Sequence, residues 1–237
     1  MIVLICARSG SQRVKNKNLK EMLGLSLIEL AIECGRALNP NRVYISTDYD
    51  CVNTEIDRNV IKLDRPKHLC GSSVPEKSVW DFHLDQLLKS GEIDDYEIIC
   101  VLPPTSPFRK LVDINNALNM LNTRSFDMVV SAVAAKKSID FNVVAKKTDG
   151  SLKAISKQFG KFSRSQDVTK YFELTTCFYL FRAPYLKAVN NIYEGNVGIF
   201  PVEEISGIDI DTPLDLEFAQ FIAPKVLPSL DWWGRES

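Results

Sequence analysis

The chain begins Met-Ile-Val-Leu-Ile-Cys-Ala-Arg-Ser-Gly-Ser-Gln-Arg-Val-Lys-Asn-Lys-Asn over residues 1–18. Residues 2–6 are an apolar run, which predicts a buried strand. Residues 7–18 hold small turn formers, four cations and no acid. Small residues let backbone N–H groups approach oxygen atoms, and Arg and Lys neutralise anions. Because ligands of open α/β sheets bind beyond the carboxyl ends of strands, this loop is predicted to hold an anion, rather than to be only a solvated charge run.

The composition limits the class of protein. With 237 residues and 45% hydrophobic residues, the chain is expected to form one domain, or one domain with a small appendage. A net charge of −1 argues against a general nucleic-acid or membrane surface, and no segment approaches the roughly 18 apolar residues of a membrane span. Six cysteines without metal-ligand spacing suggest free thiols and a cytoplasmic protein, and isolated His68 and His83 argue against a zinc site or a Ser-His-Asp triad.

Strand-like and helix-like patterns alternate along the chain. The expected strands are 2–6, 43–46, 60–63, 97–102, 127–133 and 177–182. The expected helices are 25–38, 76–89, 112–121 and one that opens at Thr212-Pro213 with a buried face made of Leu214, Phe218, Phe221 and Ile222. This order predicts a three-layer α/β fold around a mostly parallel sheet.

The pattern loosens over residues 136–172, which are polar. Two possible strands, 141–145 and 152–155, flank Asp149-Gly150, a hairpin signal. The segment is expected to leave the main sheet as a lid or a dimerisation arm, although a mobile surface loop would give the same pattern. Near the carboxyl terminus, Trp232 and Trp233 are expected to pack on the domain or on a partner subunit.

Three prolines stiffen the loop 102–109, Leu-Pro-Pro-Thr-Ser-Pro-Phe-Arg, after an expected core strand. Thr105, Ser106 and Arg109 would then be presented at the same sheet edge as the basic loop, where rigid placement favours recognition. The alternative is a stiff turn without a ligand. Ser46-Thr47-Asp48 and Arg65-Pro66 follow two other strands at that edge and are weak signals on their own.

Two carboxylates alternate with isoleucines in the segment 206–213, Ser-Gly-Ile-Asp-Ile-Asp-Thr-Pro. In an extended chain Asp209 and Asp211 would share one face, about 7 Å apart at roughly 3.3 Å per residue. Mg²⁺ takes one or two carboxylates plus substrate phosphates, so the pair is a candidate metal site. The alternative is that Asp211 helps to cap the last helix and Asp209 is solvated. A cationic loop, a possible Mg²⁺ pair and no evident nucleophile with its base favour phosphoryl or nucleotidyl transfer.

Six stretches, taken in order, resemble the acylneuraminate cytidylyltransferases, or CMP-sialic acid synthetases. They are Ala7-Arg8 through Lys17-Asn18, Ser46-Thr47-Asp48, Arg65-Pro66, Pro103 to Arg109, Val129-Val130-Ser131 and Asp209 to Thr212. The resemblance implies a nucleotide-diphospho-sugar-transferase fold and a homodimer whose arm matches 136–172. It also implies that CTP and a nine-carbon 2-keto sugar acid give a CMP-sugar and pyrophosphate, with no nucleic-acid or membrane partner.

The resemblance also implies roles for individual residues. Arg8 and Lys17 would be catalytic by holding the triphosphate. Asp211 would also be catalytic as the base, unless a metal-bound hydroxide serves instead. Asp209 and Asp211 would bind Mg²⁺. The expected nucleotide-binding residues are Ala7, Arg8, Ser9, Gly10, Ser11, Arg13, Lys17, Asn18, Arg65 and Ser73. The expected sugar-binding residues are Thr105, Ser106, Arg109, Arg164 and Thr175.

The sequence departs from the family pattern mainly at the sugar end. Gln12 replaces a lysine, with Arg13 beside it as a substitute, and Pro103 replaces a glutamine. Ser72-Ser73-Val74-Pro75-Glu76 replaces Asp-Thr-Ala-Ser-Ser, and Glu173-Leu174-Thr175-Thr176 replaces Arg-Pro-Asn-Gly. A modified bacterial nonulosonate is therefore expected as the acceptor in preference to N-acetylneuraminate. The rival hypotheses are a nucleotide-binding relative without turnover, a nucleotidyltransferase for a different acceptor and, more weakly, a dinucleotide-dependent dehydrogenase, which would need a glycine fingerprint that is absent here.

Overall fold

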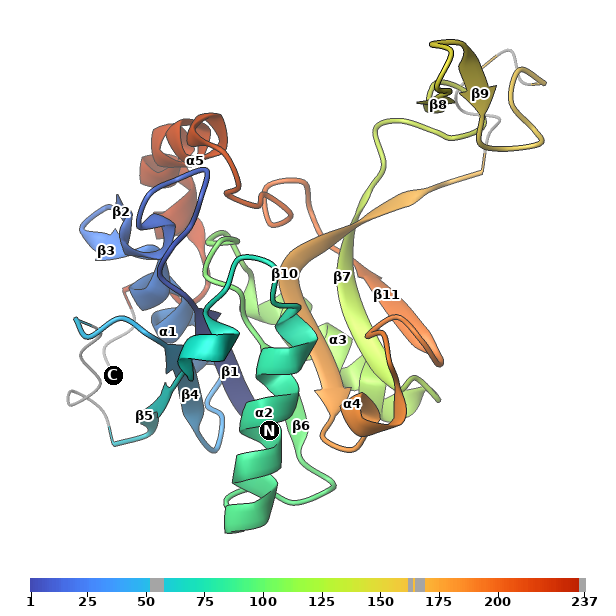
Figure 1. Cartoon of the computed structure of the whole chain (residues 1–237). Helices are drawn as coiled ribbons and strands as arrows, with labels where there is room; N and C mark the ends of the chain where they lie inside the picture. The colour runs from blue at the N-terminus through green and yellow to red at the C-terminus, as the bar shows by residue number, and fades with distance from the viewer. Residues whose placement is uncertain (52–57, 162–163, 165–168, 235–237) are drawn as a thin grey trace.

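The computed structural model describes residues 1–51, 58–161, 164 and 169–234. β1 (Ile2–Ala7) belongs to a seven-stranded sheet whose order is β11-β7-β10-β6-β1-β4-β5 (Figure 1). Its other strands are β4 (Val43–Thr47), β5 (Val60–Asp64), β6 (Ile98–Val101), β7 (Met128–Ala134), β10 (Phe172–Arg182) and β11 (Val197–Pro201). Neighbouring strands are parallel except for β10, which runs antiparallel to both β6 and β7. The expected mostly parallel sheet is therefore confirmed.

Helices cover both faces of this sheet, which makes three layers (Figure 1). The helices α1 (Leu27–Ala37), α3 (Leu111–Thr123) and α5 (Pro213–Val226) pack on one face, and α2 (Glu76–Ser90) and α4 (Tyr185–Ala188) pack on the other. Alternate residues of β1 divide between the two cores: Val3 and Ile5 join the first, and Ile2 and Leu4 join the second. A strand buried on both faces reads as a continuous apolar run, which is why residues 2–6 identified it.

Local signals set the helix ends where the sequence places them. Ser26 and Glu29 form a reciprocal capping box at the start of α1, and Gly91 ends α2 in a left-handed conformation, with φ 76°. The sequence missed β11, since it is a half-exposed edge strand with little apolar patterning. The remaining short elements are β2 (Glu21–Met22), β3 (Leu25–Ser26), η1 (Lys17–Leu19), η2 (Lys67–Leu69) and η4 (Leu227–Ser229).

Three of the four residues expected on the buried face of α5 are exposed, and only Ile222 of the four packs against the core. Leu214, Phe218 and Phe221 are 73%, 51% and 83% exposed. The fully buried residues of the helix are instead Leu216, Ala219 and Ala223. The helix carries two adjacent apolar stripes, and the small alanine side chains let its backbone come closer to the sheet than the phenylalanines would. Periodicity alone cannot choose between such stripes.

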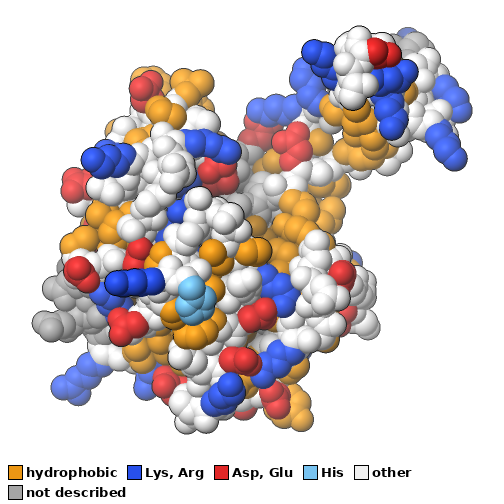
Figure 2. All heavy atoms as spheres, in the orientation of Figure 1, with side chains coloured by type: hydrophobic (Ala, Val, Ile, Leu, Met, Phe, Trp, Pro, Cys, Tyr) orange, Lys and Arg blue, Asp and Glu red, His pale blue; other side chains and the backbone are white. Residues whose placement is uncertain are grey.

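The described residues of the segment 136–171 project away from the sheet between β7 and β10 (Figure 1; Figure 2). Within this projecting segment, β8 (Val144–Lys146) and β9 (Leu152–Ala154) form the expected hairpin, although its first strand is shorter than predicted. Residues 162–163 and 165–168 of the segment, and 235–237 of the carboxyl tail, lie outside the described residues. Trp232 packs on the domain, as expected, and its Nε1 donates a hydrogen bond to the Arg109 carbonyl at 2.7 Å. Within the described ranges, no helix has the length and apolarity to cross a bilayer.

Candidate active site

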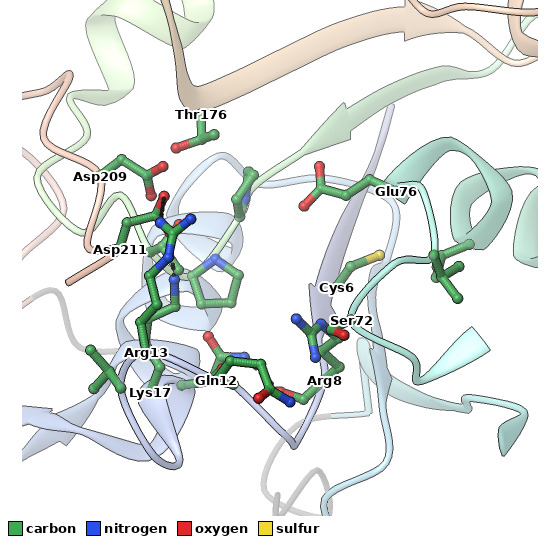
Figure 3. Close-up of a pocket in the computed structure, with 18 of the residues that line it drawn as sticks. Cys6, Arg8, Gln12, Arg13, Lys17, Ser72, Glu76, Thr176, Asp209 and Asp211 are labelled. Atoms are coloured by element: carbon green, nitrogen blue, oxygen red, sulfur yellow. Dashed lines mark hydrogen bonds and ion pairs between the residues drawn. The ribbon is translucent and has the colours of Figure 1, made fainter. Parts of the chain in front are cut away.

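A cavity of about 440 Å³ opens where β1 and β6 end (Figure 3). The chain runs from β1 outward to β4 and β5 and then returns to β6 on the other side of β1. The strand order therefore reverses between β1 and β6, which is the place where open α/β sheets bind ligands. The loop that follows β1 and the proline-rich loop that follows β6 both contribute to the cavity wall.

The basic loop forms one side of the cavity, with Arg8, Arg13 and Lys17 among its lining residues. The loop folds back on itself, because Asn18 Nδ2 donates to the Arg8 carbonyl at 3.0 Å. Gly10 makes the turn at φ +70°, a conformation that side-chain-bearing residues rarely adopt. Arg8 Nη1 donates to the Gly10 carbonyl at 3.1 Å, so this guanidinium lies close to the turn that comes after it. Three of the loop's four cations thus reach the cavity, and Lys15 is not among the lining residues.

Asp48 fixes this loop from the neighbouring strand. Its carboxylate accepts hydrogen bonds from the Ser9 backbone N–H and the Ser9 hydroxyl, each at 2.6 Å. Desolvation opposes ionisation, but these bonds outweigh it and hold the pKa of Asp48 below its usual value. In the same motif Ser46 is buried, with its hydroxyl 2.7 Å from His83 Nε2. The Ser-Thr-Asp stretch therefore orients the binding loop and does not line the cavity itself.

The acidic segment lies on the same side of the cavity as Arg13 and Lys17 (Figure 3). Asp209 and Asp211 line the cavity while Ile210 between them is fully buried, as the expected alternation requires. The Ile210 N–H donates to the Thr105 carbonyl at 2.9 Å, which joins the acidic segment to the proline-rich loop. The chain can pass this closely only because residue 207 is glycine: an added Cβ would lie 2.4 Å from Val133 Cγ1.

The basic loop and the acidic segment meet through ion pairs. Lys17 Nζ lies 3.0 Å from Asp211 Oδ1, and Arg13 Nη1 lies 3.3 Å from Asp211 Oδ2. The basic loop and the acidic pair therefore converge on one cavity although nearly the whole chain separates them. The alternative capping role fails for the Asp211 side chain, because Thr212 and Asp215 form the capping box of α5. The pair with Arg13 is exposed and adds at most about 1 kcal/mol to stability, so its importance is positional.

The two carboxylates are suitable ligands for a divalent ion. Asp209 Oδ1 is buried without a hydrogen-bond partner, and burial, together with the charge of Asp211, raises the pKa of Asp209. A hard cation between the two would relieve both effects. No group of three or more His, Cys, Asp or Glu side chains could hold a metal within the described part of the chain. An ion at this pair would therefore take its other ligands from substrate oxygen atoms and water.

Most of the expected nucleotide-binding residues lie at the cavity, but not all of them. Ser11, Asn18 and Arg65 line it together with the three cations. Arg65 also donates from Nε and Nη2 to the Leu69 carbonyl, at 3.0 and 2.8 Å, which holds the guanidinium in place. Four of the expected residues do not line the cavity, although each has a chain neighbour that does: Ala7, Ser9, Gly10 and Ser73.

The expected sugar-binding set needs more correction. Thr105 lines the cavity, but Arg109 is fully buried and donates to the carbonyls of Cys177 and Pro103. Thr175 is also buried, with its hydroxyl donating to Ser131 at 2.8 Å. The Ser106 hydroxyl is buried as well and lies 2.7 Å from Thr176 Oγ1.

Two other expected participants lie away from the cavity. Arg164 is exposed on the projecting segment, and neither Arg164 nor Glu173 is among the cavity's lining residues.

Thr176 and Glu76 are among the lining residues that were not expected. Thr176 takes the place assigned to Thr175, because successive side chains of a strand point to opposite faces. The alternation along β10 predicts this once the register is known. Glu76, the first residue of α2, also lines the cavity and faces it from the side opposite Asp209 (Figure 3). Its place at a predicted helix start was visible in the sequence, but its direction was not.

Comparisons with known proteins agree with this geometry. A family model described as cytidylyltransferase matches residues 2–225. Post-translational flagellin modification protein B of Campylobacter coli is 27% identical, with 94% of each chain covered. CMP-N,N'-diacetyllegionaminic acid synthase of Campylobacter jejuni is 26% identical, also with 94% of each chain covered.

Solved structures support the same fold. A CMP:2-keto-3-deoxy-manno-octonic acid synthetase complexed with CTP superposes with a TM-score of 0.65 at 18% identity, covering 94% of this chain and 98% of that one. A 4-diphosphocytidyl-2C-methyl-D-erythritol synthase superposes with a TM-score of 0.66 at 12% identity, covering 93% of this chain and 97% of that one. Because the family model spans nearly the entire chain, the protein belongs to the cytidylyltransferase family and is a CTP-dependent nucleotidyltransferase.

Proposed function

We propose that the protein transfers CMP from CTP to a 2-keto-3-deoxy sugar acid of the nonulosonate class and releases pyrophosphate. The observation that carries this proposal is the meeting of Lys17 and Arg13 with Asp211 at the reversal of strand order. The relatives support the acceptor class, since their names refer to diacetyllegionaminic, pseudaminic and N-acylneuraminic acids. The departures near the sugar end favour a modified bacterial nonulosonate.

The cations of the basic loop hold the triphosphate in this proposal. Arg8, Arg13 and Lys17 neutralise its oxygen atoms and the charge that develops on the leaving pyrophosphate. Asp209 and Asp211 would hold Mg²⁺, which supplies further charge neutralisation at the phosphates. The anomeric hydroxyl of the sugar acid attacks the α-phosphorus in line, the bond to pyrophosphate breaks, and Asp211 accepts the hydroxyl proton.

The ion pairs of the free protein suggest an exchange of partners during binding. Asp211 is neutralised by Lys17 and Arg13 when no phosphate is present. A triphosphate competes for both cations, and the freed carboxylate then becomes available to a divalent ion. Nucleotide and metal should therefore favour each other's binding, as linked ligands do.

We further propose that the projecting segment 136–172 is the dimerisation arm of a cytoplasmic homodimer. It carries nine Lys and Arg against three Asp, which gives +6, and the remainder of the chain is therefore −7. Apolar side chains on or beside it, including Leu152 and Leu174, are 57% and 48% exposed. A second copy offers both an opposite charge and apolar contacts. Six free cysteines support a reducing compartment.

A pyrophosphate assay tests the function. The protein is incubated with Mg²⁺, each of four nucleoside triphosphates, and N-acetylneuraminate, N,N'-diacetyllegionaminic acid or pseudaminic acid. Release is expected with CTP and a bacterial nonulosonate, and Asp211→Asn should lower kcat by at least about 100-fold. Glu217→Gln, on the exposed side of α5, is the control for charge. CTP binding without release from any acceptor would refute the proposal and favour a non-catalytic relative.

A further inference from the structure

Glu76 occupies an unusual place in the cavity. It is the first residue of α2, immediately after Pro75, and its carboxylate points into the cavity from the wall opposite Asp209, with Thr176 between them (Figure 3). The cations Arg13 and Lys17 lie on the far side from Glu76 in the same view. Glu76 thus lies away from Arg13 and Lys17, on the side of the cavity where Cys6, Ser72 and Arg8 also lie (Figure 3).

The Glu76 carboxylate lacks a partner. No hydrogen bond or ion pair joins it to another residue of the described ranges. Glu76 is exposed at the surface of the cavity, so a ligand can reach its carboxylate. The protein atoms around it, together with repulsion from Asp209, raise the pKa of Glu76, although Arg65 and Lys17 oppose this shift. A ligand that brings hydrogen-bond donors would pair with this carboxylate.

The helix explains why an acid is tolerated here but not why it faces the cavity. A carboxylate in the first turn interacts favourably with the helix dipole. An acid on the outer side of the same turn would serve the helix equally well. The inward direction needs a separate reason.

The surroundings of Glu76 suit a sugar rather than a triphosphate. Thr176 and Cys6 are labelled beside Glu76 in Figure 3, and Val79, one turn further along α2, also lines the cavity, which gives polar groups beside apolar surface. A carboxylate here would repel phosphate oxygen atoms and the carboxylate of a sugar acid alike. It would attract hydroxyl or acylamino N–H groups, which sit elsewhere on the sugar ring and its side chain.

We propose that Glu76 is an acceptor-binding residue, whose carboxylate accepts a hydrogen bond from a hydroxyl or acylamino N–H group of the sugar acid and turns the acceptor's own carboxylate away. This inference rests on the proposed function and deepens it. Glu76 thereby selects among nonulosonates by the position of their donors. It belongs to the stretch in which this chain departs from the family's Asp-Thr-Ala-Ser-Ser pattern.

Calorimetry separates this role from catalysis. Each of the three sugar acids is titrated into the protein with CTP and EDTA, which prevents metal-dependent turnover, and CTP is titrated alone. Glu76→Gln and Glu76→Ala should weaken binding of the preferred sugar acid by about tenfold or more, the loss expected for a hydrogen bond to a charged group. CTP affinity should change by less than about threefold because no phosphate contact is lost.

Two further variants act as controls. Glu76→Asp keeps the charge and should retain part of the acceptor affinity. Asp85 lies on the same helix, and its Oδ1 is 2.8 Å from Lys187 Nζ. Asp85→Asn therefore removes a carboxylate of α2 and should change neither the acceptor affinity nor the CTP affinity. In the pyrophosphate assay with Mg²⁺, Glu76→Gln should raise the acceptor KM and alter the order of preference among the three acids, while the CTP KM stays the same.

The outcomes distinguish this inference from the function itself. Unchanged acceptor affinity in Glu76→Gln overturns the role of Glu76 even if the protein is fully active. Parallel loss of CTP and acceptor binding also overturns it, since that pattern reports a damaged cavity. Sugar acids that bind but give no pyrophosphate would refute the proposed reaction alone. Failure of all three acids to bind the unsubstituted protein would overturn the assignment of Glu76.

Discussion

Replacing Arg109 by methionine should destabilise the fold by about 3 kcal/mol and leave the acceptor site intact. The guanidinium is fully buried and donates from Nε to the Cys177 carbonyl at 2.5 Å and from Nη2 to the Pro103 carbonyl. Leaving these two buried acceptors without a charged donor costs about 1.5–3 kcal/mol each. The substitution also removes a buried charge, and Arg109 Nη1 has no hydrogen-bond partner in the described part of the chain. Removing this charge offsets part of the cost.

This loss of unfolding free energy is measured by urea denaturation, with circular dichroism as the signal. It corresponds to a melting temperature lower by about 6–12 °C at this chain length. Arg124→Met, at an exposed position beyond α3, is the matched control and should change stability by less than about 0.5 kcal/mol. The reasoning fails if Arg109→Met is as stable as the unsubstituted protein while its acceptor KM rises. That result would return Arg109 to the sugar-binding role that its sequence context suggested.

Two further predictions concern the core and the binding loop. Leu216→Ala should cost about 2–4 kcal/mol because Leu216 packs in the core, whereas Phe221→Ala, at an exposed position, should cost less than about 0.5 kcal/mol. Urea titrations that rank them in the opposite order would restore the buried face expected from the sequence. Because folding lowers the pKa of Asp48, this carboxylate stabilises the fold at pH values above its unfolded-state pKa. The stabilisation is lost as the pH falls through the folded-state pKa. The free energy of unfolding of Asp48→Asn should therefore change less between pH 7 and pH 4 than that of the unsubstituted protein. An equal change in both proteins would contradict the Ser9 contact.

The sequence was sufficient where local pattern and topology act together. The apolar run 2–6 had to be a doubly buried strand, and its loop had to lie at the carboxyl edge of the sheet. Ile210 between two aspartates required an inward apolar side chain and two outward carboxylates. These constraints predicted both sides of the cavity, and the cavity brings them together.

The sequence was insufficient where a choice depended on tertiary contacts. Thr175 and Thr176 lie in the stretch of β10 where its register with β7 shifts, so the sequence could not show that Thr175 bonds to Ser131 and that Thr176 faces the cavity. Arg109 was expected to bind a ligand because the sequence does not show which groups accept its hydrogen bonds. The structure shows that they are the carbonyl of Cys177, which is distant in sequence, and the carbonyl of Pro103 in the same loop. Glu76 looked like an ordinary helix-start acid because only the assembled cavity shows what it faces. The choice between the two apolar stripes of α5 had the same origin.

The most direct test of the central claim is CTP binding to the unsubstituted protein and to Asp211→Asn, measured by calorimetry with and without Mg²⁺. The claim is that the basic loop and the acidic pair act on one triphosphate through a divalent ion. Without Mg²⁺ the variant should bind CTP at least as tightly as the unsubstituted protein, because Lys17 and Arg13 no longer pair with Asp211. With Mg²⁺ it should bind about tenfold more weakly or worse, through loss of a metal ligand. An effect of the substitution that is the same with and without Mg²⁺ would contradict the claim.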